Sequence, residues 1–161
     1  SDFFPAGLSN DAQPAIRITI QTRLNDTQLQ TSPITGHLVD NNLMPGLFTK
    51  WGDNPASWSA ARLVNERREI CFRDSLKRDV VLVQMGSKTA RRLVCRLSEG
   101  KFLQAGSPIG MACIAGVIDL YIPARCKILI KSGQHTIAGE TALAQFAAKP
   151  HVKKQNSSNQ D

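Results

Sequence analysis

The side chains best suited to nucleophilic or metal chemistry are cysteines and histidines, and their spacing brings no two of them together. The cysteines are Cys71, Cys95, Cys113 and Cys126, and the histidines are His37, His135 and His151. No two cysteines form a CxxC motif and no histidine lies at ligand spacing from either residue type, so we expect no metal site. Three cysteines lie in apolar stretches typical of strands. This favours buried free thiols in a reducing compartment, the cytoplasm.

Basic side chains provide the second recurring chemistry, because 20 Lys and Arg residues outnumber 13 acidic residues and give a net charge of +7. We expect a face that binds anionic surfaces, formed by Arg62, Arg67, Arg68, Arg91 and Arg92. Such a field attracts lipid headgroups or nucleic acid, and it is also typical of a merely solvated basic face. Only 6% of the residues are aromatic, and no basic stretch is interleaved with Phe or Tyr as a single-strand stacking platform would be.

The elements that must position these groups are short and mostly extended. With 161 residues, 42% of them apolar, the chain can build one core. Apolar Ile16, Ile18 and Ile20 alternate with polar residues, which predicts a strand over residues 15–21 with one wet face. Further strands are expected at residues 33–39, 69–73, 80–85, 93–97, 117–121, 127–131 and 141–146, a short helix at 56–66 and mostly loop at 41–58. Many short strands indicate a mainly β barrel or sandwich with at most one or two short helices.

Composition also divides the chain. We expect a loose leader at residues 1–14, one domain at residues 15–149 and a polar, disordered tail at residues 150–161. No run of eighteen apolar residues and no signal peptide is present, so we expect a soluble protein. Because Ser1 has no preceding Met, a natural segment before it, with a targeting or membrane-associating role, stays open.

A weak internal repeat relates residues 95–110 to residues 128–143. It places Gly100 opposite Gly133, and Ala105-Gly106 opposite Ala138-Gly139, at an offset of 33 residues. We predict that these glycines supply positive-φ turns in two similar hairpins related by a pseudo-twofold axis. Such units resemble the half-motifs of lipoyl and biotinyl carrier domains, the lipoyl hammerhead. No lysine stands between methionines at a hairpin tip, which argues against a swinging-arm carrier.

Several ordered motifs carry a resemblance to a known family. The strongest is the stretch VVLVQMGSKTARRLVCRLSEGKFLQAGSPIGM at Val80–Met111. It continues through Asp119-Leu120-Tyr121-Ile122-Pro123 and the closing GQ…AGET at 133–141, and upstream lie Arg17-Ile18-Thr19-Ile20, the PxxG at 33–36 and Asn65-Glu66-Arg67. From about Ile16 to Phe146 the chain thereby resembles the short, soluble-domain type of phosphatidylserine decarboxylase.

The resemblance implies an enzyme that processes itself at a Gly-Ser pair before the DxYxP strand. The serine hydroxyl attacks the preceding carbonyl, the ester eliminates, and the dehydroalanine left behind hydrolyses to a pyruvoyl group, which forms a Schiff base with the substrate amine. In this chain Ala115-Gly116 stands at the place of that pair. Because glycine has no Cβ, neither the acyl shift nor the elimination can start at Gly116. We therefore expect no pyruvoyl cofactor.

Two other positions depart from the family pattern. Where the family has a histidine that assists processing, this chain has Gln28, which has no proton to exchange near neutral pH. The aspartate of the family's PADG motif has no match, since Pro5-Ala6-Gly7 lacks the acid. Two rescues stay open: an N-to-S shift at Cys113, and His37 acting in place of the missing histidine.

The sequence therefore predicts a phosphatidylserine decarboxylase-like pseudoenzyme with a binding or scaffolding role. Its candidate pocket is formed by Gln28, Ile114, Ala115 and Gly116. The expected partner is anionic phospholipid, met at the periphery of a membrane, or another protein. Two alternatives stay open, because a fold does not fix a function: an active phosphatidylserine or amino-acid-type decarboxylase of phospholipid metabolism that uses an altered route, and a basic nucleic-acid-associated module.

Overall fold

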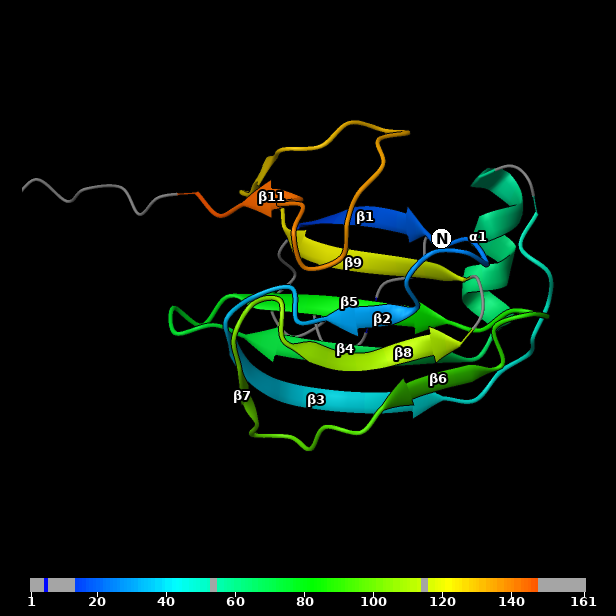
Figure 1. The fold of residues 1–161 in the computed structure, drawn as a ribbon, viewed down its shortest axis with the longest axis horizontal. Coiled ribbons are helices and arrows are strands. Elements are labelled where there is room, and N and C mark those ends of the chain that lie inside the picture. The colour runs from blue at the N-terminus through cyan, green and yellow to red at the C-terminus, as the bar shows by residue number, and fades with distance from the viewer. Residues whose placement is uncertain (1–4, 6–13, 53–54, 114–115, 148–161) are drawn as a thin grey trace, which may run out of the picture.

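A six-stranded antiparallel sheet, here called the large sheet, forms the centre of the computed structural model (Figure 1), which describes residues 5, 14–52, 55–113 and 116–147. Its strand order is β1-β9-β5-β4-β3-β7. The bounds are β1 Ala15–Gln21, β9 Val117–Pro123, β5 Asp79–Met85, β4 Arg67–Arg73, β3 Gly36–Met44 and β7 Phe102–Leu103. The predicted leader and tail lie almost wholly outside the described residues.

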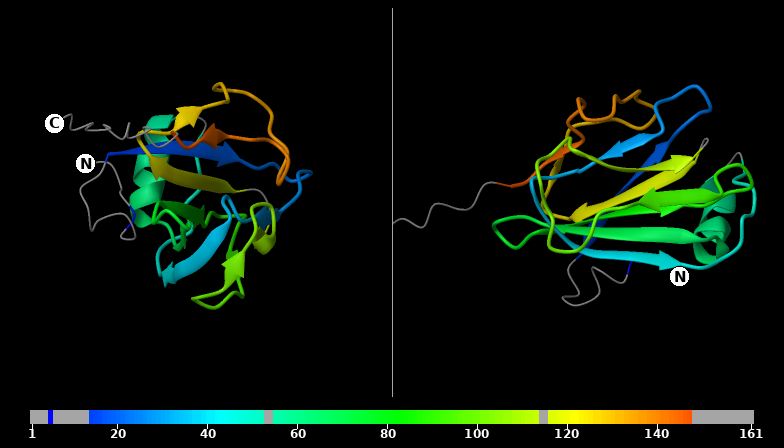
Figure 2. Two further views of the ribbon diagram at one scale, coloured as in Figure 1. Left: turned by 90° about the vertical axis from the view of Figure 1, so that its left-hand side faces the viewer. Right: turned by 60° about the horizontal axis from the view of Figure 1, so that its bottom comes forward.

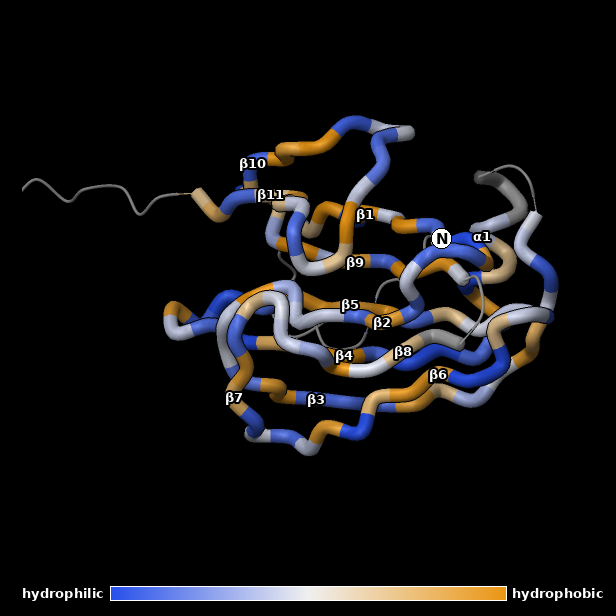
Figure 3. Tube along the Cα trace, in the orientation of Figure 1, coloured by the Kyte–Doolittle hydropathy of each residue, from blue (hydrophilic) through white to orange (hydrophobic). Residues whose placement is uncertain are grey.

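A second, three-stranded antiparallel sheet, the small sheet, packs against one face of the large sheet (Figure 2). It consists of β2 (Leu29–Thr31), β8 (Pro108–Cys113) and β6 (Arg92–Cys95), in the order β2-β8-β6. The main core lies between the sheets, where Cys95 and Ile109 of the small sheet join Phe72, Leu82 and Ile118 of the large one. In Figure 3 the strands β1 and β5, which carry much of this core, contain strongly hydrophobic stretches. The mainly β fold expected from the pattern is confirmed.

The opposite face of the large sheet carries a smaller cluster that includes Val81, Val83 and Tyr121. The helix α1 (Pro55–Val64) lies at one end of this sheet and confirms the helix expected at 56–66. A two-stranded ribbon, β10 (Lys127–Ile128) and β11 (Ala144–Gln145), completes the described elements.

Two expectations about secondary structure were only partly right. The segment 41–58 was expected to be mostly loop; residues 45–52 lie outside the helices and strands, but β3 continues through Asn41 and Asn42 to Met44 and pairs with β4. The two polar asparagines interrupt the apolar pattern, but the Asn41 amide donates to the Leu97 carbonyl at 3.1 Å, so its polar group is satisfied within the fold. Strand β2 was missed because it is only three residues long, and β7 and β8 were expected only as the extended link and the second strand of the hairpin at residues 95–110.

The repeat glycines occupy equivalent backbone conformations. Gly100 and Gly133 have φ of 81° and 80°, and Gly106 and Gly139 have φ of 84° and 77°. A Cβ built on Gly106 would lie 3.7 Å from the Gly139 carbonyl oxygen, so the two Ala-Gly turns meet. This contact between equivalent turns is compatible with a local pseudo-twofold axis. The axis itself stays a prediction.

Candidate functional site

The position of the missing serine, Gly116, is buried immediately before β9 and is bonded to Thr22, which follows β1. The Gly116 N–H donates to the Thr22 hydroxyl oxygen at 2.8 Å. The Gly116 carbonyl accepts from the Thr22 N–H at 2.9 Å and lies 3.1 Å from the Thr22 hydroxyl. Thr22 therefore fixes the backbone of this position from both sides.

Nothing local requires glycine at this position. The φ of Gly116 lies outside the left-handed region, and a Cβ built there would lie 3.5 Å from the Ala90 Cβ and 3.6 Å from the Met85 carbonyl oxygen. These are ordinary van der Waals distances. The site therefore accepts a Cβ without displacing its neighbours.

Gln28, which stands at the histidine position, organises the loop that leads into β2. Its amide nitrogen donates to the carbonyl oxygens of Arg23 and Asp26 at 3.0 and 2.9 Å. Its amide oxygen is buried and has no hydrogen-bond partner within the part of the chain that the structure describes. An unpaired buried acceptor is costly, so this oxygen is a candidate for binding a donor on a ligand.

A pair of buried amides, Gln30 and Gln84, lies further along the same segment and across from it on β5. Gln84 of β5, with 0% exposure, donates to the amide oxygen of Gln30 on β2 at 2.5 Å. The Gln30 amide nitrogen and the Gln84 amide oxygen have no partner among the described residues. Exchanging the nitrogen and oxygen of either amide does not change this count. A single hydrogen bond between the two amides always leaves one amide nitrogen and one amide oxygen without a partner.

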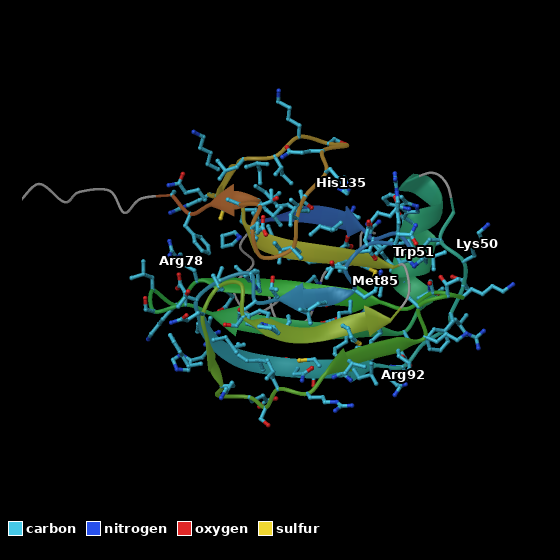
Figure 4. All side chains as sticks on the ribbon, in the orientation of Figure 1. Lys50, Trp51, Arg78, Met85, Arg92 and His135 are labelled. Carbon is cyan, nitrogen blue, oxygen red and sulfur yellow. The ribbon has the colours of Figure 1, made fainter. Side chains whose placement is uncertain are left out.

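Gln28 and Gln30 both line a cavity of about 690 Å³ between the large sheet, β2 and the segment 135–144. One wall is apolar and includes Ile20, Leu82 and Ile118. Figure 4 shows His135 on the segment above β1. The charged lining residues are Asp26 and Glu140, and no lysine or arginine is among the described residues that line the cavity.

The structure brings part of the candidate pocket together. Gln28 lines the cavity, and Gly116 adjoins it through Thr22, itself a lining residue. Ile114, Ala115 and the Cys113 side chain lie outside the described residues. His37 lies elsewhere, on β3 with its ring 5.2 Å from that of Phe102, and does not line the cavity. The proposed rescue by His37 therefore has no geometric support.

Sequence reasoning missed Thr22, Gln30 and Gln84. A signal for Gln84 existed, since it is the one amide in the otherwise apolar run VVLVQM of β5. Among the thiols, Cys126 lines the cavity, where burial raises its pKa, and burial raises the pKa of Cys71 to about 12. Both thiols therefore stay protonated at neutral pH and are poor nucleophiles.

The basic face that was expected to bind anionic surfaces is only partly exposed. Arg62 was placed on it wrongly, because its side chain is buried (3% exposed) and its guanidinium binds the Asp119 carboxylate at 2.6 Å. Arg67 is half-buried beside Glu69, and Arg68 donates to the Leu93 carbonyl at 3.1 Å. Arg91 and Arg92 are exposed.

The described residues contain no group of three His, Cys, Asp or Glu side chains that could hold a metal ion. No helix in the described part of the chain is long and apolar enough to cross a bilayer.

Comparison with known proteins gives a consistent picture. The family model described as phosphatidylserine decarboxylase matches residues 3–144. The chain is similar to phosphatidylserine decarboxylase proenzymes of Mycolicibacterium gilvum (35% identical over 142 residues), Saccharopolyspora erythraea (33% over 143) and Mycolicibacterium vanbaalenii (36% over 142). These matches cover 88–89% of this chain and 58–59% of each relative, so the chain spans less than two thirds of their length. No solved structure matches.

Proposed function

The chain belongs to the phosphatidylserine decarboxylase family, and we propose that it is a non-processing member that binds an amphiphile with a primary amine. The observation that carries the proposal is the cavity of about 690 Å³, whose lining combines an apolar wall with Asp26, Glu140 and two glutamines, Gln28 and Gln30, that each have one buried amide atom without a partner among the described residues. The relatives are named for phosphatidylserine, a lipid with such an amine.

Gly116 does not fit the pyruvoyl group that the family implies. That group is made from a side chain with a hydroxyl on Cβ, and glycine supplies neither atom. The Thr22 hydroxyl beside Gly116 is held by the backbone groups of Gly116 and belongs to another segment of the chain. No step of decarboxylation is therefore assigned to this position.

The charges of the cavity favour a cationic group. The Gln28 amide oxygen and the carboxylates of Asp26 and Glu140 are acceptors, and an ammonium group carries three donors and no acceptor. The wall formed by Ile20, Leu82 and Ile118 favours an apolar chain attached to that group. The Gln30 amide nitrogen, which has no partner among the described residues, is a donor for a carboxylate or ester oxygen of the same ligand.

We expect the chain to stay in one piece, because Gly116 supplies no nucleophile. Intact-mass spectrometry should find a single 17.6 kDa polypeptide after long incubation. Two fragments that meet near residue 115 in the unchanged protein would restore the enzyme interpretation.

We also expect no efficient cleavage of the variant Gly116→Ser. The site has room for the serine Cβ, but Ala115 and Gln28 still depart from the family pattern.

We expect short-chain phosphatidylserine, used below its micelle concentration, to bind at least about tenfold more tightly than phosphatidylglycerol of the same chain length. Both lipids are anionic, but only phosphatidylserine has an amine for the acceptors of the cavity; a tenfold ratio corresponds to about 1.4 kcal/mol. Calorimetric titration measures the ratio. Gln28→Ala should reduce it, whereas the matched change of exposed Gln104→Ala should not. Equal binding of the two lipids would contradict the proposal.

A further inference from the structure

The outer face of the small sheet carries a row of apolar side chains that have no covering element among the described residues. Leu29 of β2 and Val94 of β6 both stand opposite Met111 of β8, so the three residues form one line across the sheet. Leu29 is 41% and Met111 40% exposed, and Val94 is half-buried. Neighbours in this register contact each other and make one continuous patch rather than scattered exposed residues.

Two arginines flank the row. Side chains alternate along a strand, so Arg92 lies on the same outer face as Val94, and Arg96, which follows β6, lines the same groove as both. Both arginines are exposed, and Figure 4 shows Arg92 pointing away from the body of the protein. Together with the apolar row they line a shallow groove of about 380 Å³, and no acidic residue is among the described residues that line it.

This combination fits an anionic bilayer better than a second apolar protein surface. An apolar row can enter the headgroup boundary, while guanidinium groups beside it bind phosphate oxygens. The groove also adjoins the cavity, because Leu29 lines both. A membrane on this face would therefore bring lipid headgroups next to the cavity.

We propose that the outer face of the small sheet docks the protein on anionic phospholipid bilayers, with Leu29, Val94 and Met111 at the headgroup boundary and Arg92 and Arg96 on phosphates. The docking proposal depends on the proposed function in one respect: docking serves to deliver lipid to the cavity. The docking chemistry needs negative charge and an apolar boundary. It does not need a lipid amine.

Co-sedimentation with vesicles tests the docking separately from the cavity. Vesicles of phosphatidylglycerol and phosphatidylcholine are anionic but carry no primary amine, so binding to them reports the small sheet alone. We expect binding to these vesicles, little binding to pure phosphatidylcholine, and weakening between about 0.1 and 0.5 M salt as screening shortens the reach of the charges. Absence of binding to the anionic vesicles would overturn the docking proposal. It would not affect the proposed lipid binding in the cavity, which the titration with short-chain lipid tests separately.

Variants locate the surface. Arg92→Glu/Arg96→Glu should lower the vesicle partition coefficient by on the order of 30-fold or more, and Leu29→Ser/Met111→Ser should lower it at unchanged charge. The matched control is Arg125→Glu/Lys127→Glu, which makes the same charge change at exposed residues outside the small sheet and should have the smaller effect. Equal losses in the two charge variants, preferential binding to RNA, or a dimer that Leu29→Ser/Met111→Ser dissociates would each overturn the proposal. All variants change exposed side chains, and thermal unfolding verifies that they fold.

Discussion

Asp119→Ala is expected to lower the free energy of unfolding by about 3–5 kcal/mol, a large part of the stability of a single domain. Asp119 is fully buried on β9, and its carboxylate accepts from the Arg62 guanidinium at 2.6 and 3.1 Å and from the Thr19 hydroxyl at 2.7 Å. Without this carboxylate the guanidinium stays buried and cannot lose its proton, so its charge has no counter-ion. Urea unfolding measures the loss.

A matched control separates burial from ion pairing as such. Arg73 and Asp79 form an ion pair of similar geometry, at 2.7 Å, but the Arg73 side chain is about half exposed. Asp79→Ala should therefore cost less than about 1 kcal/mol. Replacing both buried partners, in Arg62→Met/Asp119→Leu, should recover much of the lost stability because no unpaired charge remains. A similar cost for Asp119→Ala and Asp79→Ala would contradict this account.

The same ion pair shows why the sequence could not separate surface arginines from buried ones. The pattern around Arg62 is that of a half-exposed helix, and its counter-ion is 57 residues away at Asp119. The ring centroids of Trp51 and Trp58 lie 5.8 and 5.9 Å from the guanidinium carbon of Arg62. Long-range partners of this kind leave no local signal. By contrast, the alternation in β1 and the turns at Gly100 and Gly133 are set by neighbouring residues, and the sequence predicted them.

In the candidate site, too, local motifs could be predicted from the sequence and long-range pairs could not. Gly116 and Gln28 were found because a motif marks their positions, and the structure brings both to the edge of one cavity through Thr22. The pairing of Gln30 with Gln84 depends on how the small sheet stacks on the large one. No motif or spacing records that stacking, because β2 is three residues long.

The variant Gln30→Met/Gln84→Met is expected to raise the free energy of unfolding by about 1–2 kcal/mol while weakening the preference for phosphatidylserine, because Gln30 no longer offers a donor to the serine carboxylate. Methionine has nearly the length of glutamine and needs no partner, so the exchange removes one hydrogen bond and two unpaired buried polar atoms. Each such atom costs about 1–3 kcal/mol and one neutral hydrogen bond contributes about 0.5–1.5 kcal/mol, so removing all of them stabilises the protein.

Single replacements should behave in the opposite way. Gln84→Met leaves the Gln30 amide in the core without its remaining partner, and we expect a loss of about 1–3 kcal/mol. Gln104→Met, at an exposed position, is the control and should change neither stability nor lipid preference. Urea unfolding and the phosphatidylserine titration measure the two properties on the same samples. If the double variant is stabilised but its preference for phosphatidylserine is unchanged, Gln30 is not part of the binding site. If the double variant is destabilised as much as the single replacement, the pair of amides has only a structural role. Higher stability together with a weakened preference is the result expected when buried polar atoms are kept for a ligand at the expense of stability.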